Sequence, residues 1–356
     1  MTSAFVELKT PKNLDIISDI TFSPLIQNQL LASTWSNEIL VYSYNAEHHN
    51  EEQLNPINII QTQDVPLCLL YDNSPIVGLL DGSIRELDFE NCKLSKNIGM
   101  PVNEDEIGSG INNLCHLDNH NIIASSFNGD LQTIDLRQQQ PRYINRNNRS
   151  KKIFTMDSSD RYLTMGLQNN IIEIYDFRKL DVPMETREVG LKYQIKDLKT
   201  FPNNQGFALS TIDGRVSIEF FNSDPQFQQD HRFTFKCHRH PDPSNSDVDL
   251  VYPVNSIAFN KKYETLFTGG SDGYLCLWDL NKRKRMKQYT PRFLSLEHEP
   301  ESVAKIKLNQ SDSLIAVATS DDNFKRRRRL SESESSRIPS RIYIKEVLEN
   351  ECKPKK

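Results

Sequence analysis

Fourteen residues decide the fold: Leu266-Phe-Thr-Gly-Gly-Ser-Asp-Gly-Tyr-Leu-Cys-Leu-Trp-Asp279. They contain two short apolar runs, and the pair Asp272-Gly273 stands between these runs. A two-residue hairpin turn needs positive φ angles, which Asp and Gly tolerate, so the pattern predicts two antiparallel strands joined by a tight turn. A single hairpin is compatible with many folds. The interpretation therefore depends on whether the pattern recurs.

The turn signature recurs along most of the chain. The second members of successive turn pairs are 45, 47, 41, 44 and 59 residues apart, and an alternating apolar strand follows each pair. A seventh unit is predicted at Leu314–Ser320, with its turn at Asp321-Asp322. The six turn pairs are Ser36-Asn37, Asp81-Gly82, Asn128-Gly129, Asn169-Asn170, Asp213-Gly214 and Asp272-Gly273.

This Gly-Ser-Asp-Gly…Trp-Asp pattern and its period of about 45 residues resemble the WD repeat, in which each repeat forms one four-stranded blade. The sequence therefore predicts an all-β protein, a seven-bladed WD40-type β-propeller, as a single domain over residues 1–350. Two β-sandwich domains are the alternative, but a sandwich requires no such repeat.

The N-terminal strand is expected to close the ring. Phe5–Lys9 alternates like a strand but precedes the first full repeat. The last unit supplies strands near Ser302–Leu308, Leu314–Ser320 and Arg341–Val347, and it has no obvious fourth strand. Pairing the N-terminal strand with this unit would remove two open sheet edges.

Composition narrows the class of protein. The net charge of −5 gives no overall bias toward nucleic acid, and no apolar run approaches the ~20 residues of a membrane span. The six cysteines show no CxxC spacing, which is typical of reduced thiols in a nuclear or cytosolic protein. We therefore expect neither direct nucleic-acid binding nor a membrane segment.

No catalytic constellation is evident in the sequence. It contains no GxSxG, HExxH, Walker or kinase signature, so we expect a non-enzymatic protein without cofactor or metal. The pair His48-His49 in the polar linker Ala46–Gln53 has no supporting metal ligands at a suitable spacing. A propeller hydrolase with an unrecognised site is the alternative of another class.

Four polar segments are interpreted as surface features. His238–Leu250 is rich in Pro, Ser and Asp and is predicted to be a loop, and the adjacent His238 and His240 have no evident partners. Residues 321–340 are predicted to be a disordered basic and Ser-rich insertion in blade seven, with a basophilic-kinase pattern at Arg328–Ser331. The tail 351–356 is expected to fray, and Lys282–Arg285 is either a nuclear-import patch or a solvated turn.

Several stretches in blades four to six carry a more specific resemblance, which runs from Ile17 to the end of the chain. They are similar to the spindle-checkpoint WD-repeat protein of the Bub family in its fungal form. The related propeller that binds a nuclear-pore protein in messenger-RNA export is the alternative. The stretches are Lys152–Asp157, Gly190–Asp197, Ser210–Phe221, Phe233–His238 and Tyr252–Phe259.

This resemblance implies an adaptor of the mitotic spindle assembly checkpoint. Its implied partners are GLEBS segments of the Bub-family checkpoint kinase and its pseudokinase-like relative, and phosphorylated Met-Glu-Leu-Thr repeats of the outer-kinetochore scaffold. The chain would then recruit checkpoint proteins to unattached kinetochores, as a monomeric propeller within a hetero-complex. The implied localisation is the nucleus, and the kinetochore in mitosis.

The resemblance also implies binding residues on the loop-rich face of the disk. Arg215, Lys236 and Trp35 match the family's phosphopeptide contacts. Lys196, Trp35 and Phe127 match its contacts to the GLEBS motif, although Phe127 stands where the family often has Trp. From the sequence alone, Trp35 could equally pack in a blade core.

The positions of Arg215 and Lys236 support this assignment independently. Arg215 follows the Asp213-Gly214 turn and Lys236 ends the next predicted strand, so a hairpin centred near Pro225-Gln226 would place them opposite each other. Two such cations repel each other unless an anion bridges them. A phosphothreonine brings about −1.5 to −2 charges and three acceptor oxygens. The alternative is a pair of solvated surface cations.

Overall fold

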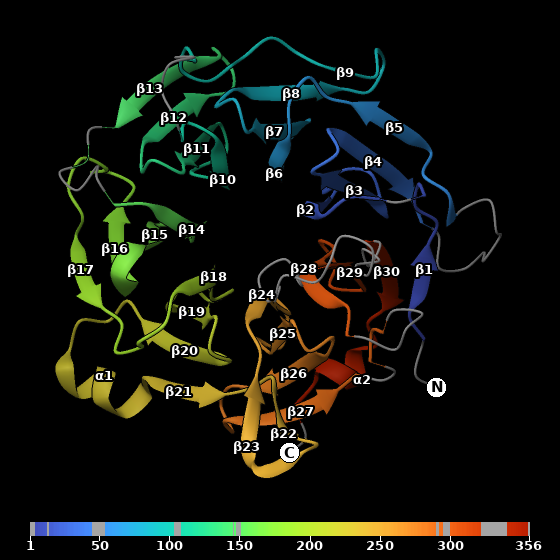
Figure 1. The fold of residues 1–356 in the computed structure, drawn as a ribbon. Helices are drawn as coiled ribbons and strands as arrows, with labels where there is room; N and C mark the ends of the chain where they lie inside the picture. Colours follow the sequence, from blue (N-terminus) through green and yellow to red (C-terminus); the bar gives the residue numbers. More distant parts are fainter. Residues whose placement is uncertain are drawn as a thin grey trace.

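The computed structural model describes residues 4–12, 14–44, 54–102, 108–144, 146, 151–289, 292–294, 300–321 and 340–354. In these residues, seven four-stranded antiparallel sheets are arranged around a central axis, and one two-stranded sheet lies outside them (Figure 1). The predicted seven-bladed β-propeller is confirmed. No helix in the described ranges is long and apolar enough to cross a membrane.

Each blade begins with an inner strand and proceeds outward by antiparallel hairpins. Blades one to three comprise β2 (Ile17–Phe22), β3 (Gln29–Thr34), β4 (Glu38–Ser43) and β5 (Asn58–Gln61); β6 (Pro66–Tyr71), β7 (Pro75–Leu79), β8 (Ile84–Asp88) and β9 (Lys93–Leu94); and β10 (Ile111–His116), β11 (Asn121–Ser126), β12 (Leu131–Asp135) and β13 (Gln140–Ile144).

The next three blades follow the same plan. They comprise β14 (Ile153–Ser158), β15 (Tyr162–Leu167), β16 (Ile171–Asp176) and β17 (Glu185–Glu188), with the short 3-10 helix η2 (Gln168–Asn170); β18 (Ile195–Thr200), β19 (Gly206–Thr211), β20 (Arg215–Phe220) and β21 (Phe233–Lys236), with α1 (Pro225–His231); and β24 (Val254–Phe259), β25 (Leu266–Gly270), β26 (Leu275–Asp279) and β27 (Lys284–Gln288).

Blade seven is completed by the N-terminus, as the sequence predicts. It comprises β28 (Ser302–Leu308), β29 (Leu314–Ser320), β30 (Arg341–Glu346) and, as its outer strand, β1 (Val6–Leu8). The register pairs Val6 with Ile344 and Leu8 with Ile342.

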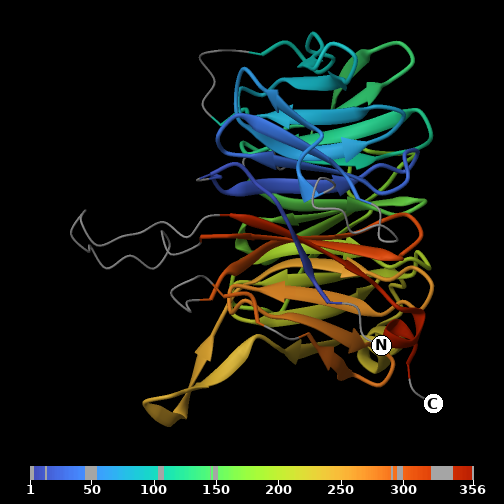
Figure 2. The same ribbon diagram turned by 90° about the vertical axis from the view of Figure 1, so that its right-hand side faces the viewer.

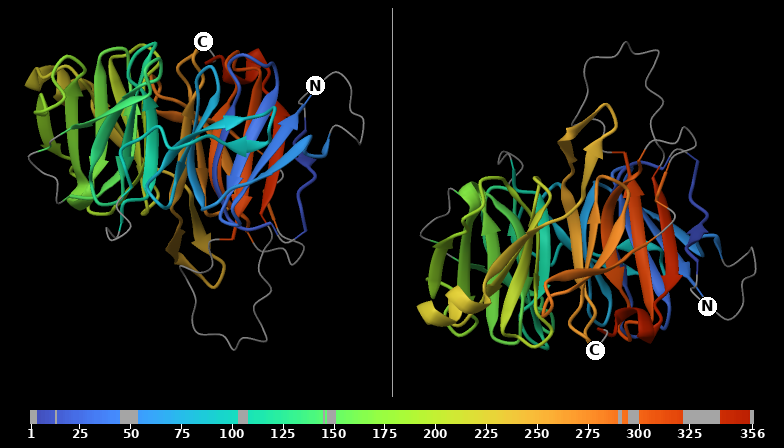
Figure 3. Two further views of the ribbon diagram at one scale, coloured as in Figure 1. Left: turned by 90° about the horizontal axis from the view of Figure 1, so that it is seen from above. Right: turned by 90° about the horizontal axis from the view of Figure 1, so that it is seen from below.

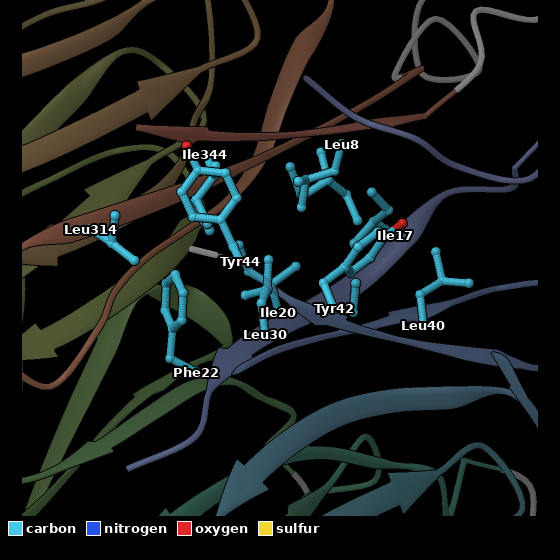
Figure 4. Packing of buried hydrophobic residues seen from close by; sticks show 14 of the residues in the cluster. Leu8, Ile17, Ile20, Phe22, Leu30, Leu40, Tyr42, Tyr44, Leu314 and Ile344 are labelled. Carbon is cyan, nitrogen blue, oxygen red and sulfur yellow. The ribbon is translucent and has the colours of Figure 1, made fainter. Parts of the chain in front are cut away.

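The N-terminal strand also joins the core between blades seven and one. Leu8 is 1% exposed and belongs to a cluster with Ile17, Tyr42 and Ile344 (Figure 4). The Tyr42 hydroxyl donates a hydrogen bond to the carbonyl of Lys9 at 3.0 Å. Burial of this apolar surface therefore holds the two ends of the ring together.

Aspartates on inner strands link neighbouring blades. Asp19 accepts a hydrogen bond from the backbone N–H of Leu69 at 3.0 Å. In the same way, Asp197 accepts from Ile257 at 2.9 Å. The inner edge of each blade has no further strand beside it, so these carboxylates satisfy backbone donors that no sheet ladder reaches.

Successive strands of a blade run in opposite directions, so the ring has two distinct faces. The inner strand begins, the second strand ends and the third strand begins at one of them, which we call the turn face. The inner strands end at the opposite face. Figures 2 and 3 show the β22–β23 hairpin projecting from the turn face, whereas α2 (Glu349–Cys352) lies at the opposite face.

The segment His238–Leu250 forms a hairpin, so its prediction as a loop was wrong. Its strands β22 (Arg239–Asp242) and β23 (Asn245–Val251) pair in an antiparallel ladder that includes His240 opposite Leu250. Its turn is built by Asp242, whose carboxylate accepts bonds from the backbone and side chain of Ser244. Local side-chain hydrogen bonds thus supply a turn that the polar composition concealed.

His238 and His240 share a hydrogen-bond partner that the sequence did not reveal. His238 Nδ1 lies 2.8 Å from Asp272 Oδ1, and His240 Nε2 lies 2.8 Å from Asp272 Oδ2. His238 Nε2 contacts Thr268 Oγ1, which in turn accepts the indole N–H of Trp278 at 2.9 Å. Burial alone would raise the pKa of Asp272, but the two imidazoles hold it below its usual value.

The chain end and the β20–β21 connection also differ from expectation. Cys352 is fully buried and Glu351 pairs with Lys287 at 2.7 Å, so the tail is ordered there and does not fray from residue 351. The β20–β21 connection contains α1, capped by Asp224, where a simple hairpin turn was expected. The insertion predicted at 321–340 lies, except for its two end residues, outside the described residues, as do the linker 46–53 and the site at 328–331.

Candidate peptide-binding face

All five predicted binding residues lie on the turn face. Trp35 and Phe127 directly follow the second strands of blades one and three. Arg215 begins β20, Lys236 ends β21, and Lys196 is the second residue of β18, all in blade five. The face therefore carries a cationic region on one blade and aromatic side chains on two others.

The expected juxtaposition of the two cations is present. Arg215 and Lys236 are register partners across the β20–β21 pair, although α1 intervenes between the strands. The turn before β20 needs glycine, because Gly214 has φ +66° and an added Cβ would lie 2.7 Å from the carbonyl oxygen of Cys237. This close packing places Arg215 at the rim of the face.

Asp213 lies among the cations. Its Oδ2 is 2.9 Å from Nε of Arg215, at ion-pair distance but without hydrogen-bond geometry. Its Oδ1 accepts a hydrogen bond from the Thr211 hydroxyl at 2.5 Å. Arg215 is 37% exposed on its side chain and Lys236 is exposed, so both remain accessible to a ligand.

Arg239 is a third cation that the sequence interpretation missed. Its Nη2 donates to the carbonyl of Asp213 at 2.8 Å, which places it beside the same turn. Its Nε is buried and has no hydrogen-bond partner among the described residues. We call Arg215, Lys236 and Arg239 the cationic cluster. In the sequence, Arg239 lies three residues after Lys236, which could have indicated that it belongs to the cluster, but this segment was predicted to be a loop.

Apolar side chains occupy one repeated position on the turn face. In four blades, the first residue after the second strand is a large apolar residue with 38–45% of its surface exposed. Its backbone N–H donates to the carbonyl of a residue just before the inner strand, for example from Trp35 to Ile16 at 2.9 Å. We call these residues the apolar ring. They are Trp35, Leu80, Phe127 and Ile212.

Trp35 is 45% exposed, so it does not pack in a blade core. Trp35 and the cationic cluster are nevertheless not neighbours, since blades six and seven lie between blades five and one. Lys196, by contrast, shares its blade with Arg215 and Lys236, and the exposed Tyr193 lies just before its strand. The face thus offers a cationic end and an extended apolar surface.

Within the described part of the chain, no group of three or more His, Cys, Asp or Glu side chains could hold a metal ion. The partners of the cationic cluster are instead expected to be anions. Arginine and lysine contact phosphate and carboxylate oxygens through charged hydrogen bonds.

Comparison with known proteins bears on this face. Residues 249–279 match the family described as "WD domain, G-beta repeat". The mitotic checkpoint protein bub3 of Dictyostelium discoideum is 31% identical over 351 residues, covering 98% of this chain and 96% of its own. The chain belongs to the Bub3 family of mitotic checkpoint proteins.

A second family member supports the same assignment. The spindle assembly checkpoint protein bub3 of Schizosaccharomyces pombe is 32% identical over 309 residues, 86% of this chain and 88% of its own. The mRNA export factor GLE2 of Chaetomium thermophilum is 29% identical over 205 residues, 58% of this chain and 53% of its own. The predicted Bub-family resemblance is confirmed, and membership supports a role as a checkpoint adaptor.

Proposed function

We propose that the chain is a non-enzymatic adaptor that binds peptides on its turn face. Its ligands are phosphorylated Met-Glu-Leu-Thr repeats of the kinetochore scaffold and GLEBS segments of Bub-family checkpoint kinases. By holding both, it recruits checkpoint proteins to unattached kinetochores from a nuclear pool. The cationic cluster beside the exposed apolar ring is the observation that carries the proposal.

The charges of the cluster favour a phosphate over a carboxylate. Arg215 and Lys236 are directly opposite and repel each other, while Asp213 is the one carboxylate of the described residues that lies within ion-pair distance of Arg215. A ligand must compete with Asp213 for Arg215. A phosphate dianion brings more charge than a carboxylate and has three oxygens that can accept from several donors of the cationic cluster at once.

The apolar ring would bind the GLEBS segment. Trp35, Leu80 and Phe127 lie on three consecutive blades, so their exposed side chains form a path along the turn face. Aromatic residues at exposed positions supply large contact area at a low entropic cost. Lys196 lies at the blade-five side, where it would pair with acidic residues of the GLEBS segment.

Calorimetry with matched peptides tests the phosphate assignment. We expect Arg215→Ala and Lys236→Ala each to weaken a threonine-phosphorylated Met-Glu-Leu-Thr peptide by about ten- to a hundred-fold, because a charged hydrogen bond contributes about 1.5–3 kcal/mol. Binding of the unphosphorylated peptide should already be weak and barely change. Lys284→Ala, which removes an exposed cation from the neighbouring blade six, is the matched control.

The salt dependence and the selectivity for the phosphorylated peptide test whether these cations recognise phosphate. Added salt should weaken binding of the phosphopeptide to the parent protein far more than binding to the Arg215/Lys236 double variant, since the cations no longer contribute there. Equal losses for both peptides in the single variants would show that these residues shape the surface without recognising phosphate.

A messenger-RNA export role through a nucleoporin GLEBS segment is the second candidate. The similarity to the mRNA export factor GLE2, over 205 residues, is the observation that favours it. Affinity capture of the full chain from mitotic and interphase extracts, followed by mass spectrometry, separates the two roles. Recovery of checkpoint kinases and kinetochore scaffold supports the first proposal, and recovery of nucleoporins alone supports the second.

A further inference from the structure

A large cavity lies at the face opposite the proposed peptide site. Its volume is about 1240 Å³, and it is lined chiefly by the ends of the inner strands of blades three to seven and by the turns that follow them. Lys199, at the end of β18, and Lys307, at the end of β28, both line it. The cavity is therefore separated from the cationic cluster by the thickness of the blades.

Three lysines stand on the inner strands near this cavity, and their pairing differs. Lys199 Nζ lies 3.2 Å from Asp157 Oδ1, and Lys305 Nζ lies 3.8 Å from Asp19 Oδ1. Lys307 has no carboxylate within ion-pair distance among the described residues. It is two positions from Lys305 on the same strand, so both side chains leave β28 on the same side.

The electrostatic surroundings of Lys307 are unfavourable for its charged form. Burial lowers the pKa of Lys307, as do the ammonium groups of Lys199 and Lys305, and the carboxylates of Asp19 and Asp157 only partly oppose this effect. Burial alone would lower the pKa of Lys199 too, but Asp157 and Asp197 outweigh it and raise that pKa. Lys199 is therefore satisfied within the protein, and Lys307 is not.

The nearby carboxylates are already engaged by the chain. Asp157 accepts hydrogen bonds from both the backbone N–H and the hydroxyl of Thr200 at 2.8 Å, which fixes it toward blade five. At the rim, Asp118 accepts the backbone N–H of His120, and Asp160 accepts the side-chain amide of Asn204. Asp312 accepts the backbone N–H of Lys261. Each of these acids completes a turn or links two blades, and none is directed to Lys307.

We propose that this cavity binds a small, multiply charged oxyanion, a phosphate ester or a polycarboxylate, and that Lys307 neutralises its charge. A bound anion would place an opposite charge next to a partly buried cation that, among the described residues, has no carboxylate within ion-pair distance. The volume of about 1240 Å³ is ample for a small molecule with several charged groups. Ser158 also lines the cavity, and its hydroxyl can donate a hydrogen bond to the same ligand.

Titration calorimetry on the full chain tests this proposal, with inorganic phosphate, inositol hexakisphosphate and citrate as probes at matched ionic strength. We expect saturable binding of at least one probe, weakened at least ten-fold by Lys307→Met. The matched control is Lys305→Met, which removes a charge from the same side of β28 but one already paired with Asp19; it should change affinity much less. Tighter binding of the phosphates than of citrate identifies a phosphate ester, and the reverse order a polycarboxylate.

The cationic cluster could itself bind these anions, so an Arg215→Ala/Lys236→Ala double variant is titrated alongside. Retained binding in that variant places the site in the cavity, and this result is independent of the proposed peptide-binding function. The proposal is overturned if no probe binds, if Lys307→Met binds as tightly as the parent, or if the double variant loses all binding.

Chemical labelling of the unaltered protein covers the case in which Lys307→Met does not fold. Acetic anhydride modifies uncharged lysine amines, and peptide mass spectrometry gives the rate at each lysine. A saturating anion should slow acetylation of Lys307 several-fold by shielding it and favouring its charged form, while Lys284 on blade six keeps its rate. Equal rates at Lys307 with and without the anion contradict the proposal.

Discussion

Replacing Leu8 by alanine tests whether the N-terminal strand holds the ring closed. Leu8 is 1% exposed and packs between blades seven and one, and β30 is the only described strand with which its strand pairs. Truncation of a fully buried leucine costs about 2–5 kcal/mol, from lost burial and from the cavity that remains. The adjacent Glu7 lies on the same strand with its side chain 52% exposed, so Glu7→Ala is the matched control.

The expected shift in melting temperature follows from the size of the chain. Unfolding entropy averages about 2.1 cal/mol/K per residue, which gives about 0.75 kcal/mol/K for a chain of 356 residues. A loss of 2–5 kcal/mol therefore corresponds to a decrease of about 3–7 °C in Tm if the propeller melts as one unit. Glu7→Ala removes only a partly exposed ion pair with Arg341 and should lower Tm by about 1 °C or less.

Differential scanning calorimetry measures both variants, and deletion of residues 2–9 extends the test. The deletion opens the edge of β30 and uncovers the cluster around Leu8, so we expect a larger decrease in Tm and a broader transition as blade seven separates from the rest. If Leu8→Ala and Glu7→Ala melt at the same temperature, the closure contributes no measurable stability and this reasoning is refuted.

Two other predictions concern the turn face. Asp272→Asn should lower Tm by about 4–7 °C at neutral pH, because removing one partner of a buried pair, here with His238, costs about 3–5 kcal/mol. The folded-state pKa of Asp272 is depressed, so its contribution to stability is present above the unfolded pKa of about 3.9 and is lost as the pH falls below that value. The Tm values of the parent protein and of Asp272→Asn should therefore converge in acid. A difference in Tm that stays constant with pH would contradict the pairing. Trp35→Ala should weaken a GLEBS peptide at least ten-fold in calorimetry with a Tm change under about 2 °C, because Trp35 is 45% exposed; the reverse pattern would assign it to the core.

The blades could be predicted from the sequence because their turns carry a strong local signal. The pairs Asp81-Gly82, Asp213-Gly214 and Asp272-Gly273 all place a glycine at positive φ. The regular spacing of these turns indicated a repeat, and the length of the repeat predicted a ring of blades. The pairing of Arg215 with Lys236 was predicted from a hairpin centred near Pro225-Gln226, and the two residues are register partners even though α1 replaces the expected turn.

The role of Asp272 could not be predicted in the same way. In the sequence it is one half of an ordinary turn pair, but in the structure its carboxylate holds both His238 and His240. Those partners lie more than thirty positions earlier, and no local pattern links them. Arg239 was missed for a related reason, since Pro, Ser and Asp around it favoured a loop. The cavity beside Lys307 is formed by several blades together and has no counterpart in any single repeat.

The same repeat explains why recognition residues gather on the turn face. In these turns a positive φ angle falls on a later residue, such as Asn37, Gly82, Gly129 or Gly214, and a residue with this φ angle is best suited by Gly or Asn. The first turn residue is held through its backbone N–H. Its side chain has different surroundings in different blades, since Ser271 is buried and accepts hydrogen bonds from Asn255 and Ser302, whereas the large apolar residues of four other blades are 38–45% exposed. Blades four and six place Gln168 and Ser271 there, whereas blades one, two, three and five place large apolar side chains. The exposed part of a large apolar side chain contributes nothing to blade packing, and apolar residues at four of these positions are what a surface for a bound peptide requires. The residues are Trp35, Leu80, Phe127 and Ile212.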